Sequence, residues 1–498
     1  MKGNGGRHSS RNNLHLSGEN DSAQVVINVN SAPIEAVDAV ENVEVLKEAE
    51  TTVSEQEMVQ DQLAVIDGEA ASIMAEINAL RRSSVNVNSL VGGQLRARVM
   101  FLHKLQGSDP NHGIARIIPT AESASWDIPT KVPHNLTLAA ESIGDVVKRG
   151  WDWLVKLVNE WIEKAKVLWN NYLGVASRNK RAAEALKERA NNGSFGKASD
   201  KISDRTLANG LAMGENKIEK AKTIAAFGML SKMTESVRSS YIDAMGDNNF
   251  DEALKYLSDG VDLKDTTKAK DASGNPVTVN SAEVTESDHA YGAFNKWLDT
   301  LVAGLKDYVQ DVTSGEAPTV LKPLGYNDND LTGFTYKISK AVAVIPGNKA
   351  FIYREKTPGT DAKAVEKMEA ATLRCGDYLL KKEYKENISD VIEVLSQAEM
   401  VDVCNHVIST CEELIQLANS VDRGKQKRDR LKKAIDSAAK RAEKASDAAE
   451  SKQLTVARKL GDAMLKQVDN PANSFQIAAN KACSSALAWV RTSMSKYS

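Results

Sequence analysis

Residues 142–173 read SIGDVVKRGWDWLVKLVNEWIEKAKVLWNNYL and carry the most regular hydrophobic pattern in the chain. Apolar residues recur there at alternating steps of four and three, which places them along one side of an α-helix. The members of this seam are Val147, Trp151, Leu154, Val158, Trp161, Ala165, Leu168 and Tyr172. The opposite side has acids four residues before bases, as in Asp152 and Lys156, and this order stabilises helices. The stretch predicts a long helix with one buried face.

The predicted start of this helix is Ser142. Ser142 and Asp145 form the pattern of a serine N-cap followed three residues later by an acid, which marks helix N-termini. The preceding segment 105–135 has the composition of a linker. Its turn-forming residues are Gly107, Pro110, Gly113, Pro119, Pro129 and Pro133. The sequence therefore predicts a boundary between a linker and a packed body at Ser142.

The charge of the chain changes at the same boundary. Residues 1–141 contain 11 Lys and Arg against 18 Asp and Glu, a net charge of −7, and the remaining residues have a net charge of +4. Residues 1–30 are rich in Asn, Gly and Ser, which is typical of disorder. In 34–80 the excess of acids limits a stable core, although apolar residues there fit short helices. The first 141 residues are therefore predicted to be a largely disordered acidic arm.

The rest of the chain is predicted to be mainly helical. Helical spacing recurs in 202–259 and from 362 to the end, and scarce proline favours helices. Alternating residues between 318 and 354, including Phe334, Tyr336 and Ile338, predict a small antiparallel sheet, with a hairpin of 342–345 and 350–353. The expected fold class is mainly α (α+β), a helical body with a small inserted antiparallel β-sheet. The predicted divisions are an arm 1–141 with its linker 105–135, helical residues 142–310, a β insertion 311–360 and helical residues 361–498.

The sequence contains no recognisable catalytic motif. Glycine-rich phosphate loops, GxSxG elbows, HExxH pairs and EF-hand loops are all missing from it. The seven histidines are scattered, and the cysteines lie outside CxxC pairs, as expected for reduced thiols in a cytoplasm. The cysteines are Cys375, Cys404, Cys411 and Cys483. We therefore expect no enzyme, metal, cofactor or small-molecule substrate.

No stretch of the sequence approaches the roughly 18 apolar residues that a membrane span needs. The N-terminus also lacks the apolar region of a secretory signal. The tryptophans of 142–173 leave three interpretations open: a helix packed in the core, a coiled-coil-like contact with another protein, or a helix on a membrane surface. We favour the packed helix.

Residues 423–459 are strongly basic, with 13 Lys and Arg against 5 Asp and Glu. Such a stretch is usually a solvated helix face, and it is also able to follow DNA phosphates without regard to base sequence. No aromatic residue is interleaved there, which argues against stacking on single strands. The candidate DNA contacts are Lys425, Lys427, Arg428, Arg430, Lys432 and Lys433.

Two Ala-Glu-Ser signals border the linker, at 121–123 and 140–142. Small-x-Glu tripeptides occur elsewhere in the chain, but a linker gives proteases an accessible backbone. The candidate processing residues are Ala139, Ala140, Glu141 and Ser142, with Ala121, Glu122 and Ser123 as a secondary site.

A known family shares this layout. The sequences that carry the likeness are Pro119-Thr120-Ala121-Glu122-Ser123, Leu138-Ala139-Ala140-Glu141-Ser142-Ile143, Asn179-Lys180-Arg181-Ala182-Ala183-Glu184-Ala185-Leu186-Lys187, Ala486-Leu487-Ala488-Trp489-Val490 and Ser495-Lys496-Tyr497. Together with the acidic arm and the tryptophan-rich helix, they resemble the internal head proteins of large tailed bacteriophages, notably the phiKZ-like group. The resemblance covers most of the chain in layout, and is specific mainly in residues 119–190 and at the C-terminus.

The resemblance implies a structural, non-enzymatic virion protein. Such a protein is made in the host cytoplasm, packaged in the prohead with scaffold and capsid proteins, and retained beside the DNA. It also implies that a prohead protease removes the arm after a small-x-Glu motif. Ala139-Ala140-Glu141 fits this motif, which makes Ser142 the new N-terminus. Thr120-Ala121-Glu122 departs from it, because threonine replaces a small residue.

Two other classes of function stay open at this point. One is a cellular helical protein that binds partners or a membrane surface through the 142–173 helix. The other is an enzyme whose site the sequence does not reveal, because one sequence shows no spatial pairs of titratable groups.

Overall fold

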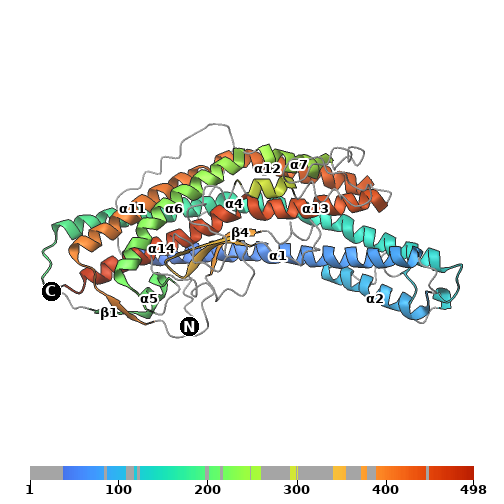
Figure 1. Ribbon diagram of the computed structural model, residues 1–498, viewed down its shortest axis with the longest axis horizontal. Coiled ribbons are helices and arrows are strands. Elements are labelled where there is room, and N and C mark those ends of the chain that lie inside the picture. The colour runs from blue at the N-terminus through green and yellow to red at the C-terminus, as the bar shows by residue number, and fades with distance from the viewer. Residues whose placement is uncertain are drawn as a thin grey trace, which may run out of the picture.

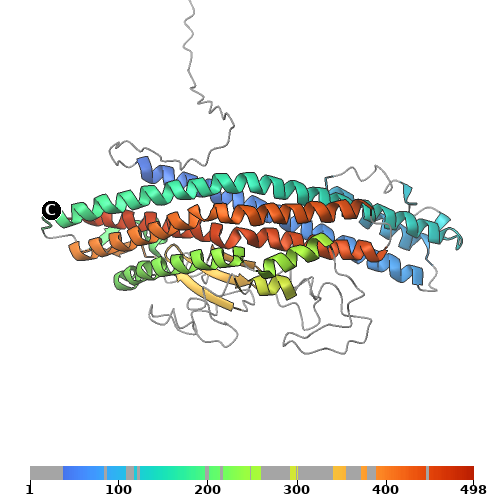
Figure 2. The same ribbon diagram turned by 90° about the horizontal axis from the view of Figure 1, so that it is seen from above.

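The computed structural model describes residues 37–82, 87–107, 117–120, 124–196, 201–213, 217–246, 248–259, 292–298, 300, 340–354, 372–377, 389–444 and 448–497. Within this part of the chain, the protein is a long bundle of helices with two small antiparallel sheets (Figure 1 and Figure 2). The expected fold class, mainly α with a small antiparallel β-sheet, is confirmed.

Long helical rods build the bundle. The longest is α4 (Val132–Asn192), whose 61 residues span about 90 Å at 1.5 Å per residue. α1 (Val37–Arg82) runs antiparallel to it, because Asn42 contacts Asn179 at one end and Arg81 reaches the Leu136 carbonyl at the other. Two further rods each consist of consecutive helices: α11 (Gln397–Asn419) with α12 (Val421–Lys444), and α13 (Ala448–Val468) with α14 (Asn470–Met494).

The tryptophan-rich seam of α4 faces the middle of this bundle. Trp151, Trp161 and Tyr172 are between 0% and 4% exposed, and Trp169 packs its ring against Tyr172 at a centroid distance of 5.8 Å. Large aromatic side chains bury much apolar area, so this seam is a main source of stability. The interpretation of 142–173 as a helix packed in the core is confirmed.

Shorter elements lie against the rods. They are α2 (Ser89–Leu105), the 3-10 helix η1 (Ala124–Trp126), α5 (Arg205–Leu211), α6 (Lys220–Gly246) and α7 (Asn248–Asp259). α6 packs alongside α11, and α7 packs alongside α12, as the Arg238–Glu413 and Lys427–Asp251 ion pairs indicate. Residues 292–298 are also helical, and Trp297 donates from its indole to the Ala244 carbonyl.

The predicted hairpin is present. β2 (Lys340–Ile345) pairs with β3 (Lys349–Arg354), and β3 pairs with β4 (Thr372–Asp377). The turn contains Gly347 and Asn348 at positive φ (88° and 54°), a region that glycine and asparagine tolerate best. The other expected strand residues, Phe334, Tyr336 and Ile338, lie outside the described residues.

The expectation of helix from residue 362 onward is wrong at two places. β4 forms the third strand of the hairpin sheet, and β5 (Val391–Glu393) pairs with β1 (Lys201–Ser203). β1 and β5 have three residues each, which is too short for an alternating pattern that would predict a strand. Each strand also pairs with a segment that is distant in the sequence.

In the part of the chain that the structure describes, nearly all buried apolar residues fall into two separate clusters. The larger one, which we call the body, contains α4 from Trp151 onward, α5 to α7, α11 to α14, and α1 as far as Leu63. The smaller one, which we call the distal module, contains α1 from Ile66, α2, η1 and α4 as far as Val146. Figure 1 shows α2 at one end of the bundle, beside the end of α1 and the start of α4. Trp153 contacts both clusters at their junction.

The expectations that excess acids limit a stable core in 34–80 and that the helices there are short are wrong for the described part of the arm. Residues 37–82 form one helix, and Leu46, Ala49, Ile66, Ile73 and Ile77 are at most 2% exposed. The excess acids do not prevent this packing, because a helix of 46 residues has room for an apolar face and a charged face. Residues 1–36 lie outside the described residues.

The predicted helix start at Ser142 is also wrong, because α4 begins ten residues earlier, at Val132. Pro133 lies in its first turn, where the fixed φ of proline favours a helix and its missing N–H costs no hydrogen bond. Leu136, Ala139, Ile143 and Val146 continue the buried seam toward the N-terminus at steps of three and four. The last part of the predicted linker is therefore helix.

Candidate processing site and basic helix

The primary candidate processing residues lie inside α4, within the distal module. Ala139 and Ser142 are fully buried, Ala140 is half-buried and Glu141 is exposed. Ala139 packs in the same cluster as Trp126, Leu95 and Leu102. The secondary residues Ala121, Glu122 and Ser123 lie outside the described residues. In the folded chain, the Glu141–Ser142 bond is thus part of a continuous helix.

Contacts from α1 and α2 hold this part of α4 on both sides of the bond. The Ser142 hydroxyl lies 2.9 Å from His103 Nε2, and Gln106 donates to the Val146 carbonyl at 2.7 Å. On α1, Arg81 donates to the Leu136 carbonyl at 3.4 Å. α2 is itself fixed to α1, because Arg98 binds Glu69 at 2.7 Å and Glu76 at 2.5 Å.

Ser142 and His103 have the spacing of a nucleophile and its base, but not the proton arrangement. Arg149 Nη2 lies 2.8 Å from His103 Nδ1, and a guanidinium is only a donor, so Nδ1 accepts. Burial and the charge of Arg149 lower the pKa of His103, which favours the neutral ring. Nε2 then carries the hydrogen and donates to Ser142, whereas an activating base has to accept from the serine. The pair therefore forms a structural hydrogen bond that links α2 to α4.

We expect the distal module to open more easily as the pH falls below about 6.5, the ordinary pKa of histidine. Because burial and Arg149 lower the pKa of His103 although Asp145 opposes them, the opened state binds more protons than the folded state below that pH. The folded state thus loses stability as the pH falls from about 6.5 to the lowered pKa of His103. In that range, the equilibrium constant for opening rises by at most about tenfold for each pH unit.

Hydrogen exchange of the amides in 89–105 and 132–146, corrected for intrinsic rates, measures this opening at pH 7.5 and pH 5.5. His103→Gln should weaken the pH dependence in these two segments, because glutamine does not titrate. Equal protection of the wild-type segments at both pH values would contradict the expectation.

The six candidate DNA contacts on α12 divide into two groups. Lys427 and Arg430 bind Asp251 at 2.7 and 2.6 Å, and Arg428 is buried against Asp469. Lys427 also lies over the Phe250 ring. These three charges are already paired with carboxylates of the same chain. Lys425, Lys432 and Lys433 lie on the outer side of the helix. Lys425 and Lys433 are exposed, and Lys432 is half-buried.

Asp469, which the sequence interpretation did not single out, is the centre of a buried polar hub. Its carboxylate is fully buried and accepts hydrogen bonds from Arg428 at 2.7 Å and the Tyr241 hydroxyl at 2.9 Å. The Trp161 indole donates to its other oxygen at 3.1 Å. Burial and the negative charge of Asp469 raise the pKa of Tyr241, so this tyrosine stays a neutral donor. The hub joins α4, α6 and α12 to the junction of α13 and α14.

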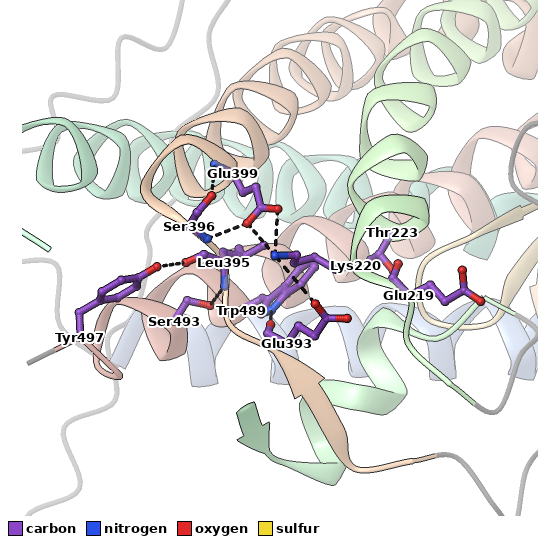
Figure 3. Close-up of polar contacts among 10 residues, drawn as sticks. All are labelled: Glu219, Lys220, Thr223, Glu393, Leu395, Ser396, Glu399, Trp489, Ser493 and Tyr497. Carbon is purple, nitrogen blue, oxygen red and sulfur yellow. Dashed lines mark hydrogen bonds and ion pairs between the residues drawn. The ribbon is translucent and has the colours of Figure 1, made fainter. Parts of the chain in front are cut away.

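The C-terminal residues that carried part of the resemblance have a structural role (Figure 3). The Trp489 indole donates to the Glu393 carbonyl at 3.0 Å, and the Tyr497 hydroxyl donates to the Leu395 carbonyl at 2.7 Å. Next to them, Ser396 caps α11 and Lys220 of α6 binds Glu399. These contacts fix the end of α14 to β5 and to the starts of α6 and α11.

The described residues contain no group of three or more His, Cys, Asp and Glu side chains placed to hold a metal ion. No helix in the same part of the chain is both long and apolar enough for a bilayer span.

Comparison with known proteins gives one match. The model of the phiKZ-like phage internal head proteins matches residues 118–492, which include α4 and all later described elements except the last two residues of α14. No curated protein and no solved structure matches the chain. The family match begins within the distal module, after α1 and α2, and covers most of the chain. The chain therefore belongs to the phiKZ-like phage internal head proteins, structural proteins that lie inside the phage head.

Proposed function

We propose that this internal head protein is made in the host cytoplasm as a precursor and is cut in the prohead. A prohead protease hydrolyses the Glu141–Ser142 bond, and residues 142–498 remain in the head as the mature protein. Capsid and scaffold proteins are the proposed partners during packaging. The acidic arm, with a net charge of −7, weakens contact between precursor and DNA, and its loss leaves a chain of net charge +4.

The division of the hydrophobic core into two clusters is the main support for a cut at Glu141. Among the described residues, all buried members of the smaller cluster except Ile143 and Val146 precede the bond. From the described part of the chain before the bond, the larger cluster takes only Leu46, Ala49 and Leu63 as buried members, with Val45, Val53 and Val59 partly buried against it. Removing residues 1–141 thus takes away nearly all of one core and leaves the other nearly complete. A cut inside the body, for example at Glu160, lacks this property.

The cut alone does not detach the first half of α1. Glu50 binds Lys481 at 2.5 Å and Lys349 at 3.5 Å, and Asn42 accepts from Arg178 at 2.6 Å. We therefore propose that the arm leaves in two steps, hydrolysis followed by dissociation of α1 from α4 and α14.

Mass spectrometry of protein from purified particles tests this function. We expect the chain in mature particles to begin at Ser142, and we expect peptides from residues 1–141 to be depleted. A chain that begins at Ser123 would move the cut to the secondary site. Intact chains from Met1 to Ser498 in mature particles would overturn the proposal of a precursor.

We also propose that α12 touches packaged DNA, through Lys425, Lys432 and Lys433 only. Phosphate contacts of this kind release counterions and ignore base sequence. The support is their position on the outer side of α12, while Lys427, Arg428 and Arg430 neutralise Asp251 and Asp469.

The triple variant Lys425→Gln/Lys432→Gln/Lys433→Gln should therefore bind duplex DNA more weakly. Its plot of log affinity against log salt should be shallower by about 3, one unit for each lost contact. Fluorescence anisotropy with labelled DNA at several salt concentrations measures both quantities. The control replaces Lys148, Lys156 and Lys164, which are exposed on α4. Equal losses in the two triple variants would refute a specific role for α12.

A further inference from the structure

The folded α4 is a poor substrate for hydrolysis at Glu141–Ser142. Proteases act on extended backbone, which folded helices do not offer, so cutting follows local opening. Here the core holds the chain on both sides of the bond, because Ala139, two residues before Glu141, and Ser142 itself are fully buried. Exposure of the Glu141 side chain alone therefore does not make the bond accessible.

The segment that has to become extended lies within the distal module. Leu136, Ala139, Ile143 and Val146 are all at most 2% exposed, and they pack against α1, α2 and η1. Extending the chain around the bond also breaks the hydrogen bonds of Ser142 with His103 and of Val146 with Gln106. Exposing the Glu141–Ser142 bond to a protease thus requires the whole smaller cluster to unpack.

This opening does not have to reach the body. From Trp151 onward, α4 packs in the larger cluster, which shares no fully buried residue with the smaller one. Gly150 and Arg458 mark the junction, where Arg458 donates to the Val147 carbonyl at 2.8 Å. The two clusters have the properties of separate cooperative units.

We propose that the distal module is a gate, and that its free energy of opening sets the rate of hydrolysis at Glu141–Ser142. The inference rests on the proposed cut at this bond. When opening and closing are fast compared with cutting, the rate follows the population of the open state.

Hydrolysis then makes the opening permanent. Water adds across the amide, and the products are a carboxylate at Glu141 and an ammonium group at Ser142. Ser142 is fully buried in the closed module, beside His103, whose other ring nitrogen lies 2.8 Å from Arg149. Returning a new positive charge to that place carries a large desolvation penalty. The cut module therefore does not close again.

Two glycines provide a matched test, because each substitution adds one methyl group. A Cβ at Gly92 would overlap the Trp126 indole, whereas a Cβ at Gly144 meets no atom within 4 Å. Gly92→Ala should open the module by overpacking, and Gly144→Ala should close it by restricting the opened chain. The probe is a glutamyl endopeptidase acting on the full-length protein, with the cut at Glu141 followed by mass spectrometry.

We expect Gly92→Ala to speed cutting at Glu141 by about tenfold or more, and Gly144→Ala to slow it by about two- to fivefold. Cutting at Glu160 and Glu163, which lie on the same helix in the body, should not change. A synthetic peptide of residues 134–148 should be cut equally with either residue at 144, which shows that the protease itself tolerates alanine there.

Equal rates at Glu141 in both variants and in the wild-type protein would overturn the gate. So would a parallel rise at Glu141 and Glu160 in Gly92→Ala, because the chain would then open as one unit. These results are independent of the particle experiment. Intact chains in particles together with the expected protease rates would refute the proposed function and leave the gate standing.

Discussion

Replacing Asp469 by alanine should lower the free energy of unfolding by about 3–5 kcal/mol, because it removes the carboxylate from a buried ion pair. Asp469 is fully buried, and Arg428 is 6% exposed. The guanidinium loses its carboxylate partner at 2.7 Å in an environment that solvates charge poorly. The donors of Tyr241 and Trp161 lose an acceptor at the same time. Urea denaturation followed by circular dichroism measures the change.

The control for Asp469→Ala is Glu160→Ala. Glu160 lies 3.8 Å from Lys156, and the two side chains are 50% and 71% exposed. An exposed pair of this kind contributes at most about 1 kcal/mol. A loss below about 1 kcal/mol in Asp469→Ala would mean that the hub is not a main support of the body.

Replacing Trp126 by alanine should unfold the distal module and leave the body folded. Trp126 is fully buried at the centre of the smaller cluster, where its ring lies against Gly92 and its indole donates to the Pro119 carbonyl at 3.2 Å. Removing a buried tryptophan costs about 3–5 kcal/mol. That is a large share of the stability of a small cluster, whereas the body shares no fully buried residue with it.

Hydrogen exchange read by mass spectrometry distinguishes the two parts after Trp126→Ala. Residues 89–105 and 132–146 should lose protection, and residues 397–419 and 470–494 should keep it. Ile128→Ala is the control, because Ile128 follows in the same segment but is 39% exposed, so its loss should change stability by less than about 0.5 kcal/mol. Loss of protection throughout the Trp126→Ala chain would contradict a separate module.

Periodicity predicted the central helix, because the seam from Trp151 to Tyr172 repeats over more than five turns. The same spacing continues through Leu136, Ala139, Ile143 and Val146, and Pro133 is a suitable first-turn residue. The start at Val132 was therefore present in the sequence as a signal. The pair of Ser142 and Asp145 gave a competing N-cap, whereas in the structure the Ser142 hydroxyl contacts His103 of α2.

Other features depend on contacts that local sequence does not contain. β1 and β5 pair across nearly 200 residues, and the hub at Asp469 gathers Trp161, Tyr241 and Arg428 from three other helices. Within the basic stretch, charge counting did not separate Arg428, which is buried, from Lys425, which is exposed. Only the fold distinguishes a charge that binds a neighbouring carboxylate from a charge that is free to meet a phosphate.

If Glu141 lies in a separately packed unit, its segment and the body open with different free energies. Native-state hydrogen exchange of the full-length protein, measured at increasing low concentrations of urea, gives the opening free energy of each segment. We predict that residues 66–82, 89–105 and 132–146 share one lower opening free energy, and that residues 151–190, 397–419 and 470–494 share a higher one. A single opening free energy and urea dependence for all six segments would contradict the division into a distal module and a body.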